Sequence, residues 1–176
     1  MKNKINILGI SGSLRSNSSA SAILNVVAAL VPEQVEFTIY NGLADIPAFD
    51  DSNKIPKPVG DLIKLLSEAD GVFFVIPEYA FGVPGALKNA LDWTVSSSTA
   101  FPGKPVALIT AATAGDKAHA AFLLTLKAIS TKIPEGATLL ISFVRSKLNE
   151  KNEVKDTATL DSIRTVINSL IVGIQN

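Results

Sequence analysis

The stretch of sequence that decides the fold is Gly71-Val72-Phe73-Phe74-Val75-Ile76, with Pro77 directly after it. A short, unbroken apolar run that stops at a proline is typical of a strand with both faces buried. Strands of this kind occur mainly in parallel sheets, because the connecting helices cover both faces of such a sheet. The run therefore predicts a buried strand of a parallel α/β sheet.

Strand and helix patterns alternate on both sides of this run, as a parallel sheet requires. Apolar or alternating runs predict strands over residues 5–10, 35–39, 71–76, 105–111 and 137–144. Helical spacing predicts helices over residues 18–31, 59–67, 84–93, 116–130 and 157–174, with a long loop over residues 41–58. No repeat or linker divides residues 1–176, so we expect a single domain with a doubly wound, five-stranded sheet. Ligands bind such sheets at the carboxyl ends of the strands, that is, at the loops after Ile10, Ile76 and Ala111.

Composition argues against several classes of protein. The chain of 176 residues has 16 Lys and Arg against 16 Asp and Glu, so we expect no attraction to nucleic acid or to anionic membranes. It has no cysteine, which excludes disulfides, thiolate metal sites and thiol nucleophiles, and we expect no bound metal. The apolar runs at residues 5–10 and 72–76 are too short for a secretion signal and a membrane span respectively, so we expect a cytoplasmic protein.

The loop after the first predicted strand has the composition of an anion site. It reads Ser11-Gly12-Ser13-Leu14-Arg15-Ser16-Asn17-Ser18-Ser19 and leads into the first predicted helix. Serine hydroxyls donate hydrogen bonds, arginine can bind phosphate through two parallel bonds, and a helix N-terminus favours negative charge. The loop therefore predicts a phosphate-binding turn, although serines that only cap the helix would look the same.

Three well-known motifs do not fit this loop. It lacks the Gly-Lys-Ser/Thr ending of a Walker loop and the G-x-G-x-x-G pattern of dinucleotide-binding folds. Gly9-Ile10-Ser11-Gly12-Ser13 is similar to a nucleophile elbow but lacks its final glycine. The phosphate site that we expect thus lies outside these three classes.

Two aromatic residues, Tyr79 and Phe81, stand in the loop after the central apolar run, where Gly82 and Pro84 stiffen the chain. Flat apolar side chains beside backbone N–H groups suit a planar heterocycle with a polar edge. A capped helix with a buried aromatic pair is the alternative, but it does not explain why these two aromatics lie in a loop.

Together these motifs resemble a known family. Gly12-Ser13-Leu14-Arg15 with Ser18, followed by Pro77-Glu78-Tyr79 and Pro84-Gly85-Ala86-Leu87-Lys88-Asn89-Ala90-Leu91-Asp92-Trp93, is similar to the NADPH-dependent FMN reductase family, which includes azoreductase- and quinone-reductase-like members. The resemblance runs over residues 5–126. It implies a flavodoxin-like fold with strand order 2-1-3-4-5, FMN as cofactor, hydride transfer from NAD(P)H, and a small-molecule electron acceptor such as a flavin, quinone or azo compound. It also implies a homodimer or homotetramer with the helix over residues 84–93 and its following loop at the contact.

The resemblance also implies which residues bind the cofactor. In the family, the positions of Ser13, Arg15 and Ser18 hold the FMN phosphate, the loop at residues 77–79 lies along the flavin ring, and the loop at residues 110–115 closes over its other side. The residues expected to bind the cofactor are Ser11, Ser13, Arg15, Ser18, Ser19, Pro77, Glu78, Tyr79, Ala80, Phe81, Thr113 and Gly115. The flavin carries the chemistry, so no side chain is expected to act as acid or base, and the lone histidine, His119, is expected to be a surface or capping residue.

The chain departs from the family pattern in three places. Asparagine is usual where Ala20 and Ala80 stand, and Ser19 and Ser21 are available to replace the asparagine missing at Ala20. The loop at residues 112–116 lacks the usual proline and glycine pair.

Two other functions therefore stay open: an electron carrier of the flavodoxin type without NAD(P)H turnover, and a flavin-free interaction protein. A carrier would present a strongly acidic face, which the zero net charge argues against. Flavin absorbance of the purified protein would exclude the flavin-free alternative.

Overall fold

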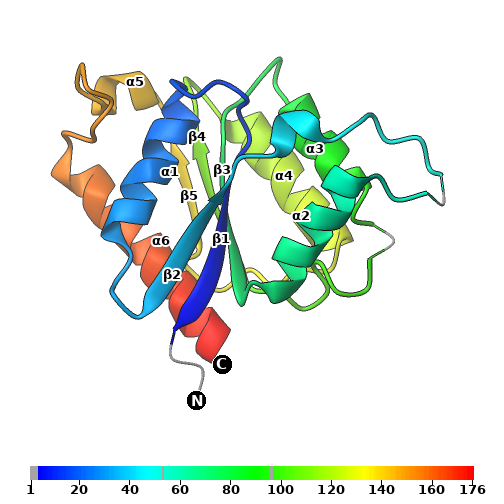
Figure 1. Ribbon diagram of the computed structural model, residues 1–176. Helices are drawn as coiled ribbons and strands as arrows, with labels where there is room; N and C mark the ends of the chain where they lie inside the picture. The colour runs from blue at the N-terminus through cyan, green and yellow to red at the C-terminus, as the bar shows by residue number, and fades with distance from the viewer. Residues whose placement is uncertain (1–3, 53, 96) are drawn as a thin grey trace.

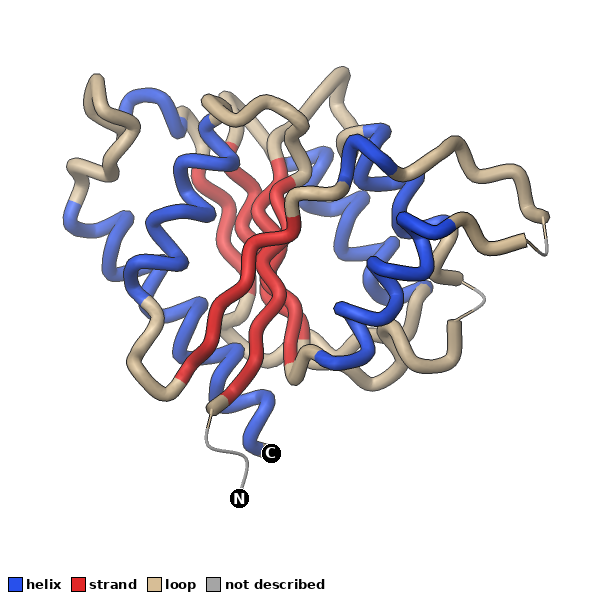
Figure 2. Tube along the Cα trace, in the orientation of Figure 1, coloured by secondary structure: helices blue, strands red, loops and turns tan. Residues whose placement is uncertain are grey.

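The structure is a computed structural model that describes residues 4–52, 54–95 and 97–176. Its middle layer is a five-stranded sheet in which every neighbouring pair is parallel, with strand order β2-β1-β3-β4-β5 (Figures 1 and 2). The strands are β1 (Ile5–Ser11), β2 (Val35–Tyr40), β3 (Gly71–Ile76), β4 (Val106–Ala111) and β5 (Thr138–Ile141). The predicted fold and strand order are confirmed.

Helices cover both faces of the sheet (Figure 1). One face carries α1 (Ser19–Leu30) and α6 (Thr157–Gln175), and the other carries α2 (Lys57–Glu68), α3 (Gly85–Asp92) and α4 (Asp116–Ala128). A short helix, α5 (Val144–Lys147), follows β5, and a 3₁₀ turn, η1 (Leu43–Asp45), follows β2. Within the described part of the chain, no helix combines the length and apolarity that a membrane crossing needs.

The central run of the sequence is the strand that both halves of the core share. Val72, Phe74 and Ile76 face the cluster beneath α2, α3 and α4, because alternate side chains of a strand point to opposite faces. Phe73 and Val75 face the cluster beneath α1 and α6. All five side chains are 0% exposed, and burial of each large apolar side chain contributes roughly 1.5–3 kcal/mol.

Several predicted element boundaries differ from those of the structure. The predicted strand over residues 137–144 is the four-residue β5, because the backbone turns at Phe143 (φ 50°) and α5 starts at the next residue. Pro84, predicted inside its helix, is the residue before it: its ψ of 128° is extended, and α3 begins at Gly85. The helix predicted over residues 59–67 starts at Lys57, since Pro58 lies in the first turn, where no N–H is needed. The predicted loop over residues 41–58 is therefore shorter, and it contains η1.

Candidate functional site

Hydrogen bonds join the loops at the carboxyl edge of the sheet into one surface. The Ser13 hydroxyl, in the loop after β1, lies 3.2 Å from the Tyr79 hydroxyl in the loop after β3. Glu78, next to Tyr79, accepts a 2.9 Å hydrogen bond from the backbone N–H of Ala118 in α4. Two segments 66 residues apart in sequence thus meet where the predicted site lies.

The first of these loops, residues 12–18, is held close against the sheet. The Gly12 N–H donates to the Val75 carbonyl at 2.8 Å, and a Cβ on Gly12 would lie only 3.1 Å from the Ile76 side chain. Ser18 is the N-cap of α1, and its buried hydroxyl accepts from the Ser21 N–H at 3.0 Å. The serines therefore do cap the helix, and the same loop presents the exposed Arg15.

The Ser21 hydroxyl connects three parts of this loop. It donates to the Arg15 carbonyl at 3.1 Å and lies 2.9 Å from the Ser18 hydroxyl and 3.2 Å from the Ser11 hydroxyl. Ala20, where the family has asparagine, is 0% exposed and packs in the core beneath α1. The polar side chain at this place in the helix is thus that of Ser21, one residue further on.

A cavity of about 300 Å³ opens beside this loop, between the segments that follow β1 and β2 and the start of α1. Arg15 lines it together with the hydroxyl residues Ser11, Ser13, Ser21 and Tyr40. Burial, and then repulsion from Asp45 and Asp61, raises the pKa of Tyr40, so its hydroxyl keeps its proton. No carboxylate is among the described residues that line this cavity, so its chemistry suits an anion.

The loop after β3 contains a strained two-residue turn. Tyr79 and Gly82 exchange two backbone hydrogen bonds, of 3.1 and 2.9 Å. The two residues between them, Ala80 and Phe81, have φ of 48° and 60°. Positive φ at both central positions is the type I′ turn, which usually needs glycine or asparagine. The Phe81 side chain is 77% exposed, so the turn presents an aromatic ring to solvent instead of burying it.

The lone histidine, predicted to be a surface or capping residue, is partly exposed, and its ring is anchored to the sheet. His119 is half-buried in α4, and its Nδ1 lies 2.8 Å from the hydroxyl of Thr110, which is completely buried at the end of β4. Burial lowers the pKa of His119 below its usual 6.5, so the ring is neutral at pH 7. The contact joins a helical residue to a strand residue nine positions earlier, and the sequence carries no signal for it.

The loop after β4 is short and is fixed by the chain that follows β5. Gly115 has φ of 94°, and a Cβ there would lie 2.7 Å from the Leu140 side chain, so this position requires glycine. The Thr113 carbonyl accepts from the Phe143 N–H at 3.0 Å. Phe143 was missed by sequence analysis, because its apolar surroundings in the sequence indicate a continuing strand.

The structure therefore brings most of the predicted residues to one edge. Ser11, Ser13, Arg15 and Ser18 share the loop after β1, and Tyr79 meets that loop directly. Pro77 is buried at the end of β3, and Glu78 is directed to α4. Thr113 and Gly115 lie in the loop after β4. Ser19 is the exception: in the described part of the chain, no hydrogen bond connects its side chain to the loop.

Comparisons with known proteins show the family to which this chain belongs. The family model for NADPH-dependent FMN reductase matches residues 5–144. A quinone reductase of Escherichia coli is 34% identical over 115 residues, which is 62% of this chain and 61% of that protein. An NAD(P)H-dependent FMN reductase of Pseudomonas aeruginosa is 35% identical over 113 residues, 62% of this chain and 60% of that protein. The alignments thus span about three-fifths of these relatives.

The fold has clear counterparts among solved structures. A flavoenzyme NAD(P)H:(acceptor) oxidoreductase from Paracoccus denitrificans superposes with a TM-score of 0.79, covering 97% of both chains at 22% identity. At that identity the likeness concerns the fold. Because the family model spans residues 5–144, which contain all three loops of the site, this chain belongs to the NADPH-dependent FMN reductase family.

Proposed function

We propose that this protein is an FMN-dependent reductase that takes electrons from NAD(P)H and delivers them to quinones or similar small acceptors. The observation that carries the proposal is the 3.2 Å contact between Ser13 and Tyr79, which joins the hydroxyl-rich anion loop to the loop that presents the exposed aromatic ring. A ligand with a phosphate at one end and a planar ring at the other fits both loops at once. FMN is such a ligand.

The residues present suit this cofactor. Ser13, Ser18 and Arg15, with the N-terminus of α1, would hold the phosphate. Ser13 and Arg15 line the cavity beside the loop, and none of the described residues that line this cavity is a carboxylate. The backbone of residues 77–81 would lie along the ring, with Thr113 and Gly115 on the third side. When bound, FMN supplies the redox chemistry, accepting hydride from NAD(P)H and passing electrons to the acceptor.

The protein's own part is to bind and orient. Glu78 holds the loop after β3 against α4, and the Tyr79–Gly82 turn keeps the ring of Phe81 at the surface. The His119 ring lies 2.8 Å from the hydroxyl of the buried Thr110, so it holds the end of β4 in place, and we assign the redox chemistry to the flavin alone. Quinones as acceptors are supported by the similarity to the quinone reductase of Escherichia coli.

The test is anaerobic mixing of the FMN-loaded protein with NADH or NADPH. One equivalent of nucleotide per flavin should remove the absorbance of the oxidised flavin, because a hydride carries two electrons. Oxygen or a quinone should restore the absorbance, and steady-state plots against both substrates should give parallel lines. If neither nucleotide reduced a stoichiometrically bound flavin, the electron-carrier function would replace this proposal.

We also propose that the protein is a cytoplasmic homodimer or homotetramer. The segment after α3 supports an interface there, since Val95 is 68% exposed beside a helix that the family uses for contact. Light scattering at micromolar concentration tests the oligomeric state, and a mass of one chain, 18.5 kDa, would exclude both assemblies.

A further inference from the structure

Phe143 is a large apolar side chain in a place where neither packing nor backbone preference explains it. Its ring is 67% exposed, and its backbone is left-handed, with φ of 50°. Such a conformation is unfavourable for a bulky residue, and glycine or asparagine would adopt it more easily. None of the ring–ring contacts in the described part of the chain includes Phe143.

Three hydrogen bonds fix this residue beside the loop after β4. The Phe143 N–H donates to the Thr113 carbonyl at 3.0 Å, and the Val144 N–H donates to the Ala112 carbonyl at 3.1 Å. The Ser142 hydroxyl donates to the Ala114 carbonyl at 3.0 Å. Each residue of the segment 142–144 is thus bonded to the loop that contains Thr113, a predicted cofactor contact.

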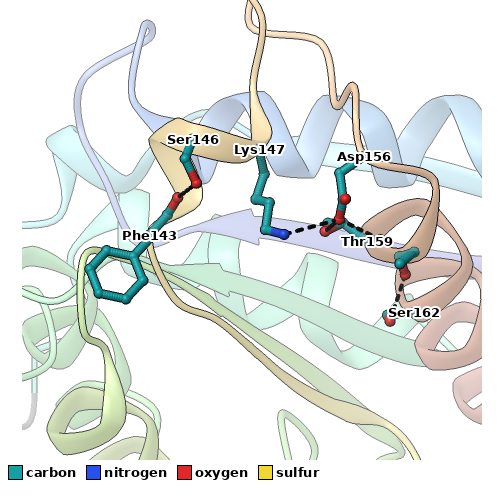
Figure 3. Close-up of polar contacts among 7 residues, drawn as sticks. Phe143, Ser146, Lys147, Asp156, Thr159 and Ser162 are labelled. Atoms are coloured by element: carbon teal, nitrogen blue, oxygen red, sulfur yellow. Dashed lines mark hydrogen bonds and ion pairs between the residues drawn. The ribbon is translucent and has the colours of Figure 1, made fainter.

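Ser146 holds the Phe143 carbonyl from the other side, and a separate polar network lies beyond it at Lys147 and Asp156 (Figure 3). The Ser146 N–H and hydroxyl both donate to the Phe143 carbonyl, each at 2.8 Å. Lys147 pairs with Asp156 at 3.3 Å, and Asp156 in turn caps α6 by accepting from the Thr159 N–H at 3.0 Å. Figure 3 shows the ring of Phe143 directed away from this network. A strained residue that is exposed, yet held from two sides, is typical of a functional position.

We propose that the Phe143 ring forms an apolar wall of the acceptor site and favours planar aromatic acceptors over small inorganic ones. The inference rests on the proposed function. It assigns a contact with the acceptor to the segment after β5, which lies outside all the sequence motifs described above. A flat quinone gains from an offset or edge-to-face contact with a phenyl ring, whereas a compact inorganic anion does not. A contact of this size corresponds to a difference in affinity of about 3- to 10-fold.

The experiment compares Phe143→Asn with Phe143→Tyr in the FMN-loaded protein, with a naphthoquinone and ferricyanide as alternative acceptors. Asparagine removes the ring and tolerates the left-handed backbone, whereas tyrosine keeps the ring. We expect Phe143→Asn to raise KM for the naphthoquinone about 3- to 10-fold and to leave kcat and the kinetics with ferricyanide unchanged. Phe143→Tyr should behave like the natural protein. Leu124→Ala is the matched control, because Leu124 is 70% exposed on α4, and it should change neither acceptor's KM.

A second readout does not depend on turnover. The melting temperature of Phe143→Asn, measured without flavin, should be equal to or higher than that of the natural protein, by up to about 4 °C, because strain is relieved. Equilibrium binding of the naphthoquinone to the oxidised, FMN-loaded protein should weaken by the same factor as KM rises. This binding measurement tests the inference even if nucleotide fails to reduce the flavin, in which case the proposed function alone is wrong.

Four results would overturn the inference. An unchanged KM and binding constant for the naphthoquinone would show that the ring does not touch the acceptor. A weaker affinity for FMN with unchanged acceptor binding would place the ring on the cofactor. A lower melting temperature of Phe143→Asn would show that Phe143 supports the fold. A smaller mass of this variant in light scattering would show that Phe143 is buried between copies of the chain.

Discussion

The carboxylate of Glu78, in the loop after β3, caps the helix α4 by accepting a 2.9 Å hydrogen bond from the Ala118 N–H in the first turn of that helix. Gly115, the N-cap residue itself, has no side chain to do this. The loop after β3 therefore depends on α4 for its position, and α4 depends on that loop for its cap. This link connects two of the three loops of the site.

Loss of this cap should destabilise the protein. We expect Glu78→Ala to lower the free energy of unfolding by about 1–2 kcal/mol, the usual effect of removing a cap, and Glu78→Gln to lose less, since its amide oxygen still accepts. Urea denaturation measures both. Glu150→Ala, at an exposed position, is the control and should change little. A Glu78→Ala protein as stable as the natural one would show that water replaces the carboxylate without loss.

The turn at Ala80 should be improved by the residue that the family prefers. Ala80 has φ of 48°, and asparagine adopts this left-handed region more readily than alanine. We expect Ala80→Asn to raise the free energy of unfolding by up to about 1 kcal/mol. The control is Ala48→Asn, in an exposed loop without positive φ, which should be neutral or slightly unfavourable. Equal effects of the two substitutions would show that the turn stores no strain.

These two residues also show how far the sequence predicts the site. The loop after β3 was placed correctly, because a buried apolar run that ends at Pro77 predicts a central strand of a parallel sheet with a loop directly after it. The turn within it was not predicted, since Ala80 and Phe81 lack the glycine or asparagine that signals type I′ geometry. Side-chain contacts from Tyr79 to Ser13 and from Glu78 to Ala118 hold the start of this loop, and these tertiary contacts carry no local sequence signal.

The segment after β5 escaped prediction for a related reason. Phe143 and Val144 continue the apolar pattern of β5, and only their bonds to Thr113 and Ala112 turn the chain into α5. The contact between His119 and Thr110 likewise depends on how α4 packs on β4. Periodicity predicts strands and helices well, but it says nothing of bonds between loops that are distant in sequence.

His119 should make the stability depend on pH. Burial lowers its pKa in the folded protein below the 6.5 of the unfolded chain. Between these two pKa values the unfolded state binds more protons, so stability falls as the pH drops below about 6.5 and levels off below the folded-state pKa. Urea midpoints measured between pH 5 and pH 8 should show this slope, and His119→Gln should remove it. Asp50, Asp116 and Asp156 have pKa values lowered below 3.8, so they do not titrate in this window. A slope that persists in His119→Gln would assign it to another group.

Arg15 should bind the cofactor without supporting the fold. Its side chain is exposed in the loop after β1, so Arg15→Ala should unfold at the same urea concentration as the natural protein. Loss of a charge-assisted hydrogen bond, about 1.5–3 kcal/mol, should weaken FMN binding by roughly ten- to a hundredfold. Quenching of flavin fluorescence measures the affinity, with Arg164→Ala, an exposed arginine in α6, as the control. Equal affinity of both variants would place the phosphate elsewhere.

Ser21 should act on the cofactor through the loop that it holds together. Its hydroxyl donates to the Arg15 carbonyl at 3.1 Å and contacts the hydroxyls of Ser18 and Ser11, so Ser21→Ala leaves three groups of the loop without this partner. Because the N-cap bond from the Ser21 N–H to Ser18 remains, α1 itself should persist and the urea midpoint should fall only slightly.

The affinity for FMN should fall about fivefold in Ser21→Ala, the equivalent of about 1 kcal/mol for one net hydrogen bond. Ser162→Ala is the control, since Ser162 lies in α6 and its hydroxyl donates to the Ala158 carbonyl of the same helix. The double variant Arg15→Ala with Ser21→Ala then separates the two roles. If Ser21 acts by positioning Arg15, its removal should have almost no further effect once the arginine is gone, whereas additive losses would mean that Ser21 contacts the phosphate itself.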